Sequence, residues 1–115
     1  MKFIIKDVNG RPWAEFPEEN EVKGWLLSAF LEEARPNPKD YLDEISRAEQ
    51  NAETATGYTG NHVDVEFHSD RAVIEDLYPE DPDADPEKIE ISLADAKQLL
   101  LDWQAAIKDW SPQNT

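Results

Sequence analysis

The sequence predicts a single α+β domain, in which an antiparallel sheet of four to five strands is packed on one face by helices. Three observations support this fold class: an Asn-Gly pair between two strand-like segments, a strictly alternating segment at residues 62–68, and three segments with helical spacing of apolar residues. They give the order ββααβββα along the chain. Because 115 residues without an internal linker fit one domain, residues 1–115 are expected to fold together.

The N-terminal segment predicts a β-hairpin. Lys2–Val8 and Arg11–Phe16 are strand-like, and Asn9-Gly10 between them is typical of a type I′ turn, which needs positive φ at both central positions. Pro12 cannot donate a hydrogen bond to a neighbouring strand. The second strand is therefore expected at a sheet edge, or only after the proline.

Two helices are expected next. Asn20 suits the N-cap of a helix at Glu21–Ala34, and Asn37 with Pro38 favours the start of a second helix that runs to about Ala52. Both segments have apolar residues at helical spacing. The residues expected to face the core are Val22, Trp25, Leu26, Leu27, Ala29, Phe30, Leu31, Tyr41, Leu42, Ile45 and Ala48.

The C-terminal half predicts three further strands. His62–His68 alternates apolar and polar residues, which indicates a half-buried strand, and the segments Arg71–Leu77 and Lys88–Ile91 follow it as strands. Thr54–Asn61, which contains two glycines, is expected to be a loop. The acidic, proline-rich segment Pro79–Glu87 is expected to be another.

The last helix has the clearest pattern in the chain. Ser92 suits its N-cap, and Ser111-Pro112 is expected to end it, which leaves residues 111–115 as a frayed tail. Its apolar residues recur at intervals of three and four, as Leu93, Ala96, Leu100, Trp103, Ile107 and Trp110.

The composition excludes several kinds of site. The chain has no cysteine, so disulfides, thiolate nucleophiles and zinc–thiolate sites are absent. No apolar run reaches the length of a signal-peptide core or a membrane span, and we expect a soluble cytoplasmic protein. The glycines are scattered and no nucleophile elbow occurs. We therefore predict a binding protein, not an enzyme, with no cofactor and no metal.

The chain is strongly acidic, with a net charge of −15. The charge is uneven: residues 1–60 carry 12 acidic and 7 basic residues, whereas residues 61–115 carry 14 acidic and 4 basic residues. Such a surface repels nucleic acids and anionic membranes, and it attracts basic proteins. The same acidity is also compatible with a role in solubility alone.

The polar face of the strand predicted at residues 62–68 is a candidate for catalysis or metal binding. It carries His62, Asp64, Glu66 and His68. Alternate residues of a strand lie roughly 7 Å apart, so neighbouring pairs could share a metal ion, and a histidine beside a carboxylate is a plausible acid–base pair. The two histidines are about 20 Å apart, too far to bind one ion. A solvated strand face and a partner-binding surface are the alternatives.

Three aspartates in the predicted acidic loop have the spacing that opens a calcium-binding loop. Asp81, Asp83 and Asp85 match D-x-D-x-D, but Pro86 follows where the tight turn needs glycine, and Ser92 occupies the position of the bidentate glutamate. The sequence therefore does not predict a calcium site of this type.

The densest charge in the chain predicts a docking surface for a basic protein, with a solvated acidic loop as the alternative. Over residues 64–90 there are 11 acidic and 2 basic residues, and three prolines stiffen the loop, which lowers the cost of ordering it on binding. The residues predicted to bind the partner are Asp64, Glu66, Glu75, Asp76, Glu80, Asp81, Asp83, Asp85 and Glu87.

The four tryptophans are expected to lie mostly in the core. Trp13, on a probable edge strand, and Trp110, at a helix end, are the two that could instead contact a partner.

The C-terminal half resembles a known family. The run GNHVDVEFHSDRAVIEDLY, an acidic spacer and the run IEISLADAKQLLLDWQAAI are similar to the small acidic immunity proteins of contact-dependent growth inhibition and other polymorphic toxin systems of bacteria. The resemblance covers roughly residues 57–110. It implies an antitoxin that binds and neutralises one cognate toxin domain, frequently a nuclease. A nuclease needs basic surface to bind phosphates, which an acidic inhibitor complements.

Two other functions fit the same residues. One is an acidic adaptor or nucleic-acid mimic that binds some other basic protein. The other is a small enzyme or metal protein that uses the strand face between His62 and His68.

Overall fold

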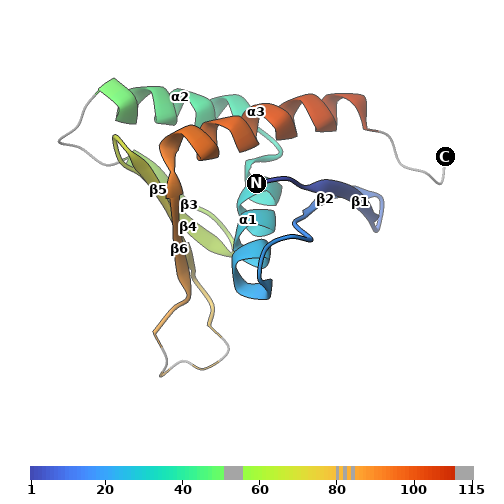
Figure 1. The fold of residues 1–115 in the computed structure, drawn as a ribbon, viewed down its shortest axis with the longest axis horizontal. Coiled ribbons are helices and arrows are strands. Elements are labelled where there is room, and N and C mark those ends of the chain that lie inside the picture. Colours follow the sequence, from blue (N-terminus) through green and yellow to red (C-terminus); the bar gives the residue numbers. More distant parts are fainter. Residues whose placement is uncertain (51–55, 80, 82, 84, 111–115) are drawn as a thin grey trace.

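The computed structural model describes residues 1–50, 56–79, 81, 83 and 85–110 of the chain, and it confirms the α+β class (Figure 1). Six strands and three helices occur in the described residues. Their bounds are β1 Ile4–Val8, β2 Arg11–Glu15, α1 Glu21–Ala34, α2 Pro38–Gln50, β3 Thr56–Thr59, β4 Val63–Phe67, β5 Arg71–Asp76, β6 Lys88–Ser92 and α3 Leu93–Asp109.

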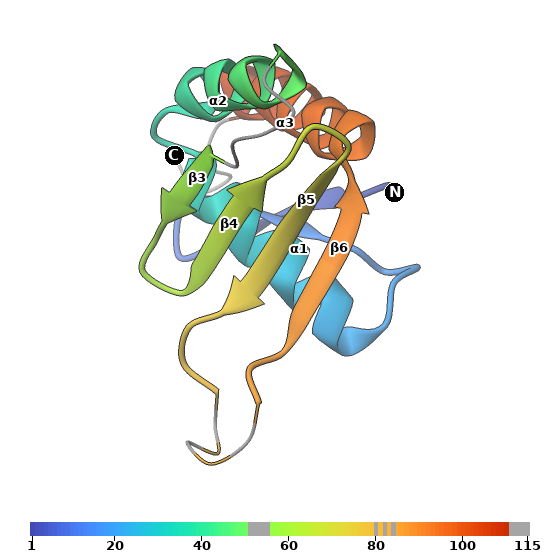
Figure 2. The ribbon, with the colours of Figure 1, turned by 90° about the vertical axis from the view of Figure 1, so that its left-hand side faces the viewer.

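The main sheet is an antiparallel meander in the order β3-β4-β5-β6. Helices cover one of its faces, as predicted: α1 lies behind the strands, and α2 and α3 run side by side over one end of the sheet (Figure 2). The side chains that alternate inward along β4 and β5 are Val63, Val65, Phe67, Ala72 and Ile74, all of them buried. The opposite face of the sheet is open to solvent.

The N-terminal hairpin forms a separate two-stranded sheet and does not extend the main one. Asn9 and Gly10 have φ of 55° and 81°, as a type I′ turn requires, and the Gly10 N–H donates to Asp7 Oδ1 at 2.8 Å. Pro12 lies inside β2, which pairs only with β1, so the predicted edge position is confirmed.

Strand β3 corrects the prediction of a loop at residues 54–61. Thr56–Thr59 pairs antiparallel with β4, and the Tyr58 ring stacks on Tyr41 of α2 with centroids 4.4 Å apart. Gly57 is required by close packing: a Cβ atom there would lie 1.9 Å from the Val65 carbonyl oxygen. The glycine that suggested a loop is therefore what lets β3 approach β4.

The helix starts agree with the capping residues expected from the sequence. Asn20 accepts a hydrogen bond from the Lys23 N–H at 2.8 Å, and Ser92 accepts one from the Asp95 N–H at 3.0 Å. Helix α1 has the predicted bounds. Helix α2 is described to Gln50, and the expected end at Ala52 and the tail at 111–115 lie outside the described residues.

One hydrophobic core joins the sheet, all three helices and β2. Trp103 of α3 and Phe30 of α1 are its largest fully buried side chains. None of the helices within the described residues is long and apolar enough to cross a membrane.

Substituting Gly57 with alanine is expected to destabilise the fold by about 1–3 kcal/mol, because the new methyl group would force β3 away from β4. Gly24, inside α1, is the matched control: its Cβ would meet Phe16 at 3.6 Å, an ordinary contact, so Gly24→Ala should be neutral or stabilising. Urea unfolding measures both. Equal losses of stability in the two variants would contradict this account of β3.

Candidate functional site

The acidic residues predicted to bind a partner fall on two separate surfaces. Asp64, Glu66 and Glu75 lie on the solvent-exposed face of the sheet, called here the outer face. Asp76, Asp81, Asp85 and Glu87 line a groove between α1 and the β5–β6 connection. Asp83 is exposed on that connection, and Glu80 lies outside the described residues.

Carboxylates on the outer face have polar or basic neighbours within the sheet. Asp64 Oδ1 accepts a hydrogen bond from the Thr59 hydroxyl at 2.7 Å, and His68 Nε2 lies 2.6 Å from Glu66 Oε1. Glu75 stands opposite Lys88 of β6 in the strand register. Because its negative charges are interleaved with cationic or titratable groups, the outer face attracts a basic partner less than the acid count suggests.

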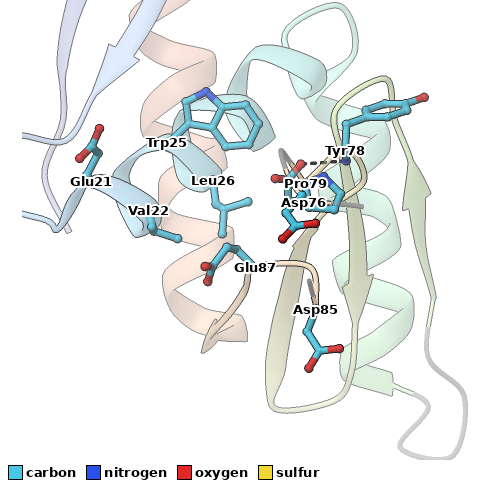
Figure 3. Close-up of a pocket in the computed structure, with 10 residues that line it drawn as sticks. Glu21, Val22, Trp25, Leu26, Asp76, Tyr78, Pro79, Asp85 and Glu87 are labelled. Carbon is cyan, nitrogen blue, oxygen red and sulfur yellow. Dashed lines mark hydrogen bonds between the residues drawn. The ribbon is translucent and has the colours of Figure 1, made fainter. Parts of the chain in front are cut away.

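The groove has a volume of 570 Å³ and combines apolar and acidic walls (Figure 3). Its apolar part comes from α1 and from the residues that follow β5, and consists of Val22, Trp25, Leu26, Tyr78 and Pro79. Its acidic part is made of Glu21, Asp76, Asp81, Asp85 and Glu87. A volume of this size accommodates several side chains of a bound molecule.

Three large apolar side chains of the groove are exposed to solvent. Val22 and Trp25 each keep 43% of their surface exposed, and Tyr78 keeps 72%. Val22, Trp25 and Leu26 have the i, i+3, i+4 spacing of one helix face, so they form a continuous strip along α1. Trp25 and Tyr78 are thus both exposed where they line the groove. Tryptophan and tyrosine are among the residue types most enriched at the strongest contacts of protein interfaces.

The exposure of Val22 and Trp25 corrects the prediction that both face the core. Helix α1 has apolar residues around most of its circumference, and the structure buries the side that carries Leu27, Phe30 and Leu31. Of the four tryptophans only Trp103 is fully buried, while Trp13 and Trp110 are partly exposed. The sequence does contain a sign of this exposure, because α1 has more apolar residues than one buried helix face needs.

Backbone hydrogen bonds fix both ends of the β5–β6 connection. The Asp76 N–H donates to the Glu87 carbonyl at 2.8 Å, and the Leu77 N–H donates to the His62 carbonyl at 2.9 Å. Asp76 Oδ1 then accepts the Tyr78 N–H at 3.0 Å, which closes a tight turn directly after β5. Asp76, Tyr78 and Glu87 are therefore held in place at the wall of the groove.

No basic side chain balances the groove. Within the described ranges, none of the carboxylates of Glu21, Asp76, Asp81, Asp85 and Glu87 forms an ion pair. Like charges that share a groove repel one another, and a bound cation relieves that repulsion. The groove therefore has a negative potential that its own protein does not neutralise.

Trp25 also lines two neighbouring hollows. One, of 610 Å³, lies towards the hairpin and includes Val8, Trp13 and His62; the other, of 280 Å³, lies between β2 and the start of α1. Trp25 is thus at the meeting point of three concave surfaces. A partner that spans this part of α1 would therefore contact Trp25 from any of these hollows.

The histidines do not converge on one site. His62 precedes β4, where its backbone N–H donates to the Glu33 carboxylate, and His68 follows β4, where its ring meets Glu66. In the part of the chain that the structure describes, no three histidine, aspartate or glutamate side chains lie close enough to hold a metal ion. In the acidic segment, the Asp83 N–H donates to Asp81 Oδ1 at 3.0 Å.

Tyr41 and Tyr58 form a pair of stacked polar aromatic side chains between α2 and β3. Burial raises the pKa of Tyr41 to about 12, and the nearby Glu33 carboxylate adds to the effect. Burial also raises the pKa of Tyr58, and Glu44 and Asp40 act in the same direction. The Tyr58 hydroxyl donates to the Asp40 carbonyl at 3.2 Å, so this pair joins β3 to α2.

No protein-family model, curated protein or solved structure matches this chain.

Alkaline pH is expected to destabilise the fold through Tyr41. Between its ordinary pKa of 10.0 and its folded value of about 12, the phenol is protonated in the folded protein but ionised in the unfolded chain. The free energy of unfolding therefore falls as pH rises through this window, by about 2 kcal/mol. Urea unfolding below pH 10 and near pH 12 measures the change. Tyr41→Phe should reduce the pH dependence; an identical dependence in both proteins would contradict the assignment.

Proposed function

We propose that this chain is an immunity protein, which binds and neutralises a cognate toxin domain with a basic surface, most simply a nuclease. The groove beside Trp25 is the observation that carries the proposal. It combines five carboxylates that have no ion-pair partner in the described residues with the exposed side chains of Val22, Trp25 and Tyr78. This combination suits a folded basic protein, because such a partner supplies both cations and apolar surface.

The two parts of the groove support different steps of binding. A net charge of −15 steers a basic partner towards the chain and raises the association rate. Contacts with exposed aromatic residues such as Trp25 and Tyr78 exclude water and slow dissociation. An inhibitor needs both properties, since it must capture its toxin quickly and retain it.

The acidity of the chain also explains why a nuclease is the leading partner. An enzyme that cleaves nucleic acid presents lysine and arginine residues to the phosphate backbone. An acidic protein that covers this surface competes directly with the substrate, so occupancy of the basic surface is itself inhibition.

An acidic adaptor or nucleic-acid mimic is the second candidate. The observation that favours it is the spread of charge: exposed carboxylates such as Asp83 lie outside the groove. This function predicts binding to several cationic proteins with a steep dependence on salt. An immunity protein should instead bind one partner tightly, and retain it at high salt through the apolar contacts.

Co-expression tests the proposal directly. The partner to use is the C-terminal toxin domain encoded by the reading frame beside this gene. Cells that express the toxin alone should lose viability, and this chain should restore it. In vitro, the purified chain should inhibit the toxin at a stoichiometric ratio. A lack of protection, or the absence of a toxin domain in the neighbouring reading frame, contradicts the proposal.

Neutralising the groove should slow association with that toxin domain. Combining Asp81→Asn, Asp85→Asn and Glu87→Gln removes three unpaired charges, and we expect the association rate to fall about tenfold at low salt. Stopped-flow mixing measures it.

The control combines Asp43→Asn, Asp102→Asn and Asp109→Asn. These exposed residues lie on α2 and α3, over the other end of the sheet, and the net charge changes by the same amount. An equal effect of both sets would show that overall charge, and not the groove, directs the encounter.

A further inference from the structure

We propose that the groove beside Trp25 receives one short segment of the partner, in which an apolar side chain packs on Trp25 and is flanked by arginine or lysine residues. This inference rests on the proposed function and deepens it, because it specifies which surface binds and which chemistry it recognises.

The apolar strip on α1 specifies the centre of the segment. Val22 and Trp25 are exposed. Leu26, one helical turn after Val22, is 1% exposed and closes the base of the groove. Pro79 stands on the opposite wall (Figure 3). A hydrocarbon or aromatic side chain placed between these walls would remove apolar surface from water on both sides.

The acidic residues specify what flanks that side chain. Figure 3 shows the Glu21 carboxylate beyond the α1 strip on one side of the groove, and Asp76 and Glu87 on the side of the strands. Carboxylates on both sides of an apolar floor match a side chain with a basic residue before and after it. Arginine fits especially well, since its guanidinium can pair with a carboxylate and stack on an indole ring.

A metal ion or a second copy of this chain matches the groove less well than a basic segment. The described carboxylates do not form a group of three close enough to coordinate one ion. A second copy would bring another net charge of −15 to a groove that is already negative. A separate basic chain satisfies the charge without either difficulty.

The surface beyond Trp25 gives the segment a direction. The hollow on the hairpin side shares Trp25 with the groove but is lined by one basic and one acidic residue, Arg11 and Glu32, with His62, around the apolar Pro12 and Trp13. In this direction the surface past Trp25 carries no excess of carboxylates. The basic residues of the segment therefore pair within the groove, with Glu21 on one side and with Asp76 and Glu87 on the other, and an apolar residue beyond them continues over α1 towards the hairpin.

A synthetic peptide tests this binding mode on the full-length chain. The probe carries a leucine and a tryptophan flanked by arginine and lysine. Its first control replaces the apolar residues with serine at unchanged charge, and its second replaces the basic residues with glutamate. In a ¹H–¹⁵N spectrum the chain shows four tryptophan indole signals. The Trp25 signal is assigned from its loss in Trp25→Phe.

The expected result is that the probe shifts the Trp25 indole signal and the amide signals of Val22, Tyr78 and Glu87, and leaves that of the buried Trp103 unchanged. Both control peptides should bind at least about tenfold more weakly than the probe. If the serine peptide binds as tightly as the probe, the groove recognises charge alone and the inference is wrong.

Variants of the chain make the test specific to the groove. Trp25→Ala should weaken probe binding about tenfold or more. Leu101→Ala is the matched control, because Leu101 on α3 is 41% exposed and Trp25 is 43% exposed. The double variant Asp64→Asn with Glu66→Gln, on the outer face, should have little effect. If it weakens binding more than Trp25→Ala, the outer face is the binding surface and the inference is overturned.

Failure of this inference is distinguishable from failure of the proposed function. If the chain neutralises the toxin domain and Trp25→Ala protects as well as the unmodified chain, the groove is not the binding site although the immunity role holds. If the probe binds at Trp25 and no toxin is neutralised, the groove binds basic apolar segments and the immunity role is wrong.

Discussion

The position of α1 between the hairpin and the main sheet is the constraint on which the rest of the structure depends. The side chain of Ser28 is buried, and its hydroxyl donates to the Ala14 carbonyl of β2 at 2.5 Å. At its C-terminal end, α1 is joined to the turn before β4 by the hydrogen bond from the His62 N–H to the Glu33 carboxylate. Gly60 leaves room for that carboxylate, since a Cβ there would lie 1.8 Å from it. These contacts fix the rotation of the helix about its axis.

Once that rotation is fixed, the exposed strip on α1 follows from geometry. The side of the helix with Leu27, Phe30 and Leu31 faces the core, and Ser28 faces β2, so Val22 and Trp25 are left beside the end of the sheet. The connection after β5 leaves the sheet at this same end (Figure 1). The groove is therefore a consequence of where α1 begins relative to where β5 ends, and no additional helix or strand is needed to form it.

Local signals in the sequence predicted most of the fold, and interactions between distant residues account for what they missed. The Asn9-Gly10 turn and the N-caps Asn20 and Ser92 depend on neighbours within a few residues, and each has the expected geometry. Strand β3 was missed because Gly57 within it and Gly60 just after it resemble a loop until β4 is packed against Gly57. The orientation of Trp25 was missed for the same kind of reason: on a helix with apolar residues around most of its surface, periodicity alone does not indicate which side the tertiary structure buries.

The residues of the predicted acidic site fall on two surfaces with different energetics, which the sequence did not separate. On the outer face, Thr59 and His68 contact Asp64 and Glu66, so a partner would have to compete with existing interactions before it gained new ones. In the groove, where the carboxylates form no ion pair within the described residues, their mutual repulsion and the exposure of Trp25 are both unfavourable in the isolated chain, and one basic apolar partner removes both at once. Solubility alone accounts for the charges but not for an exposed tryptophan among them. That coincidence, which only the folded structure reveals, is why we propose that the groove binds a partner.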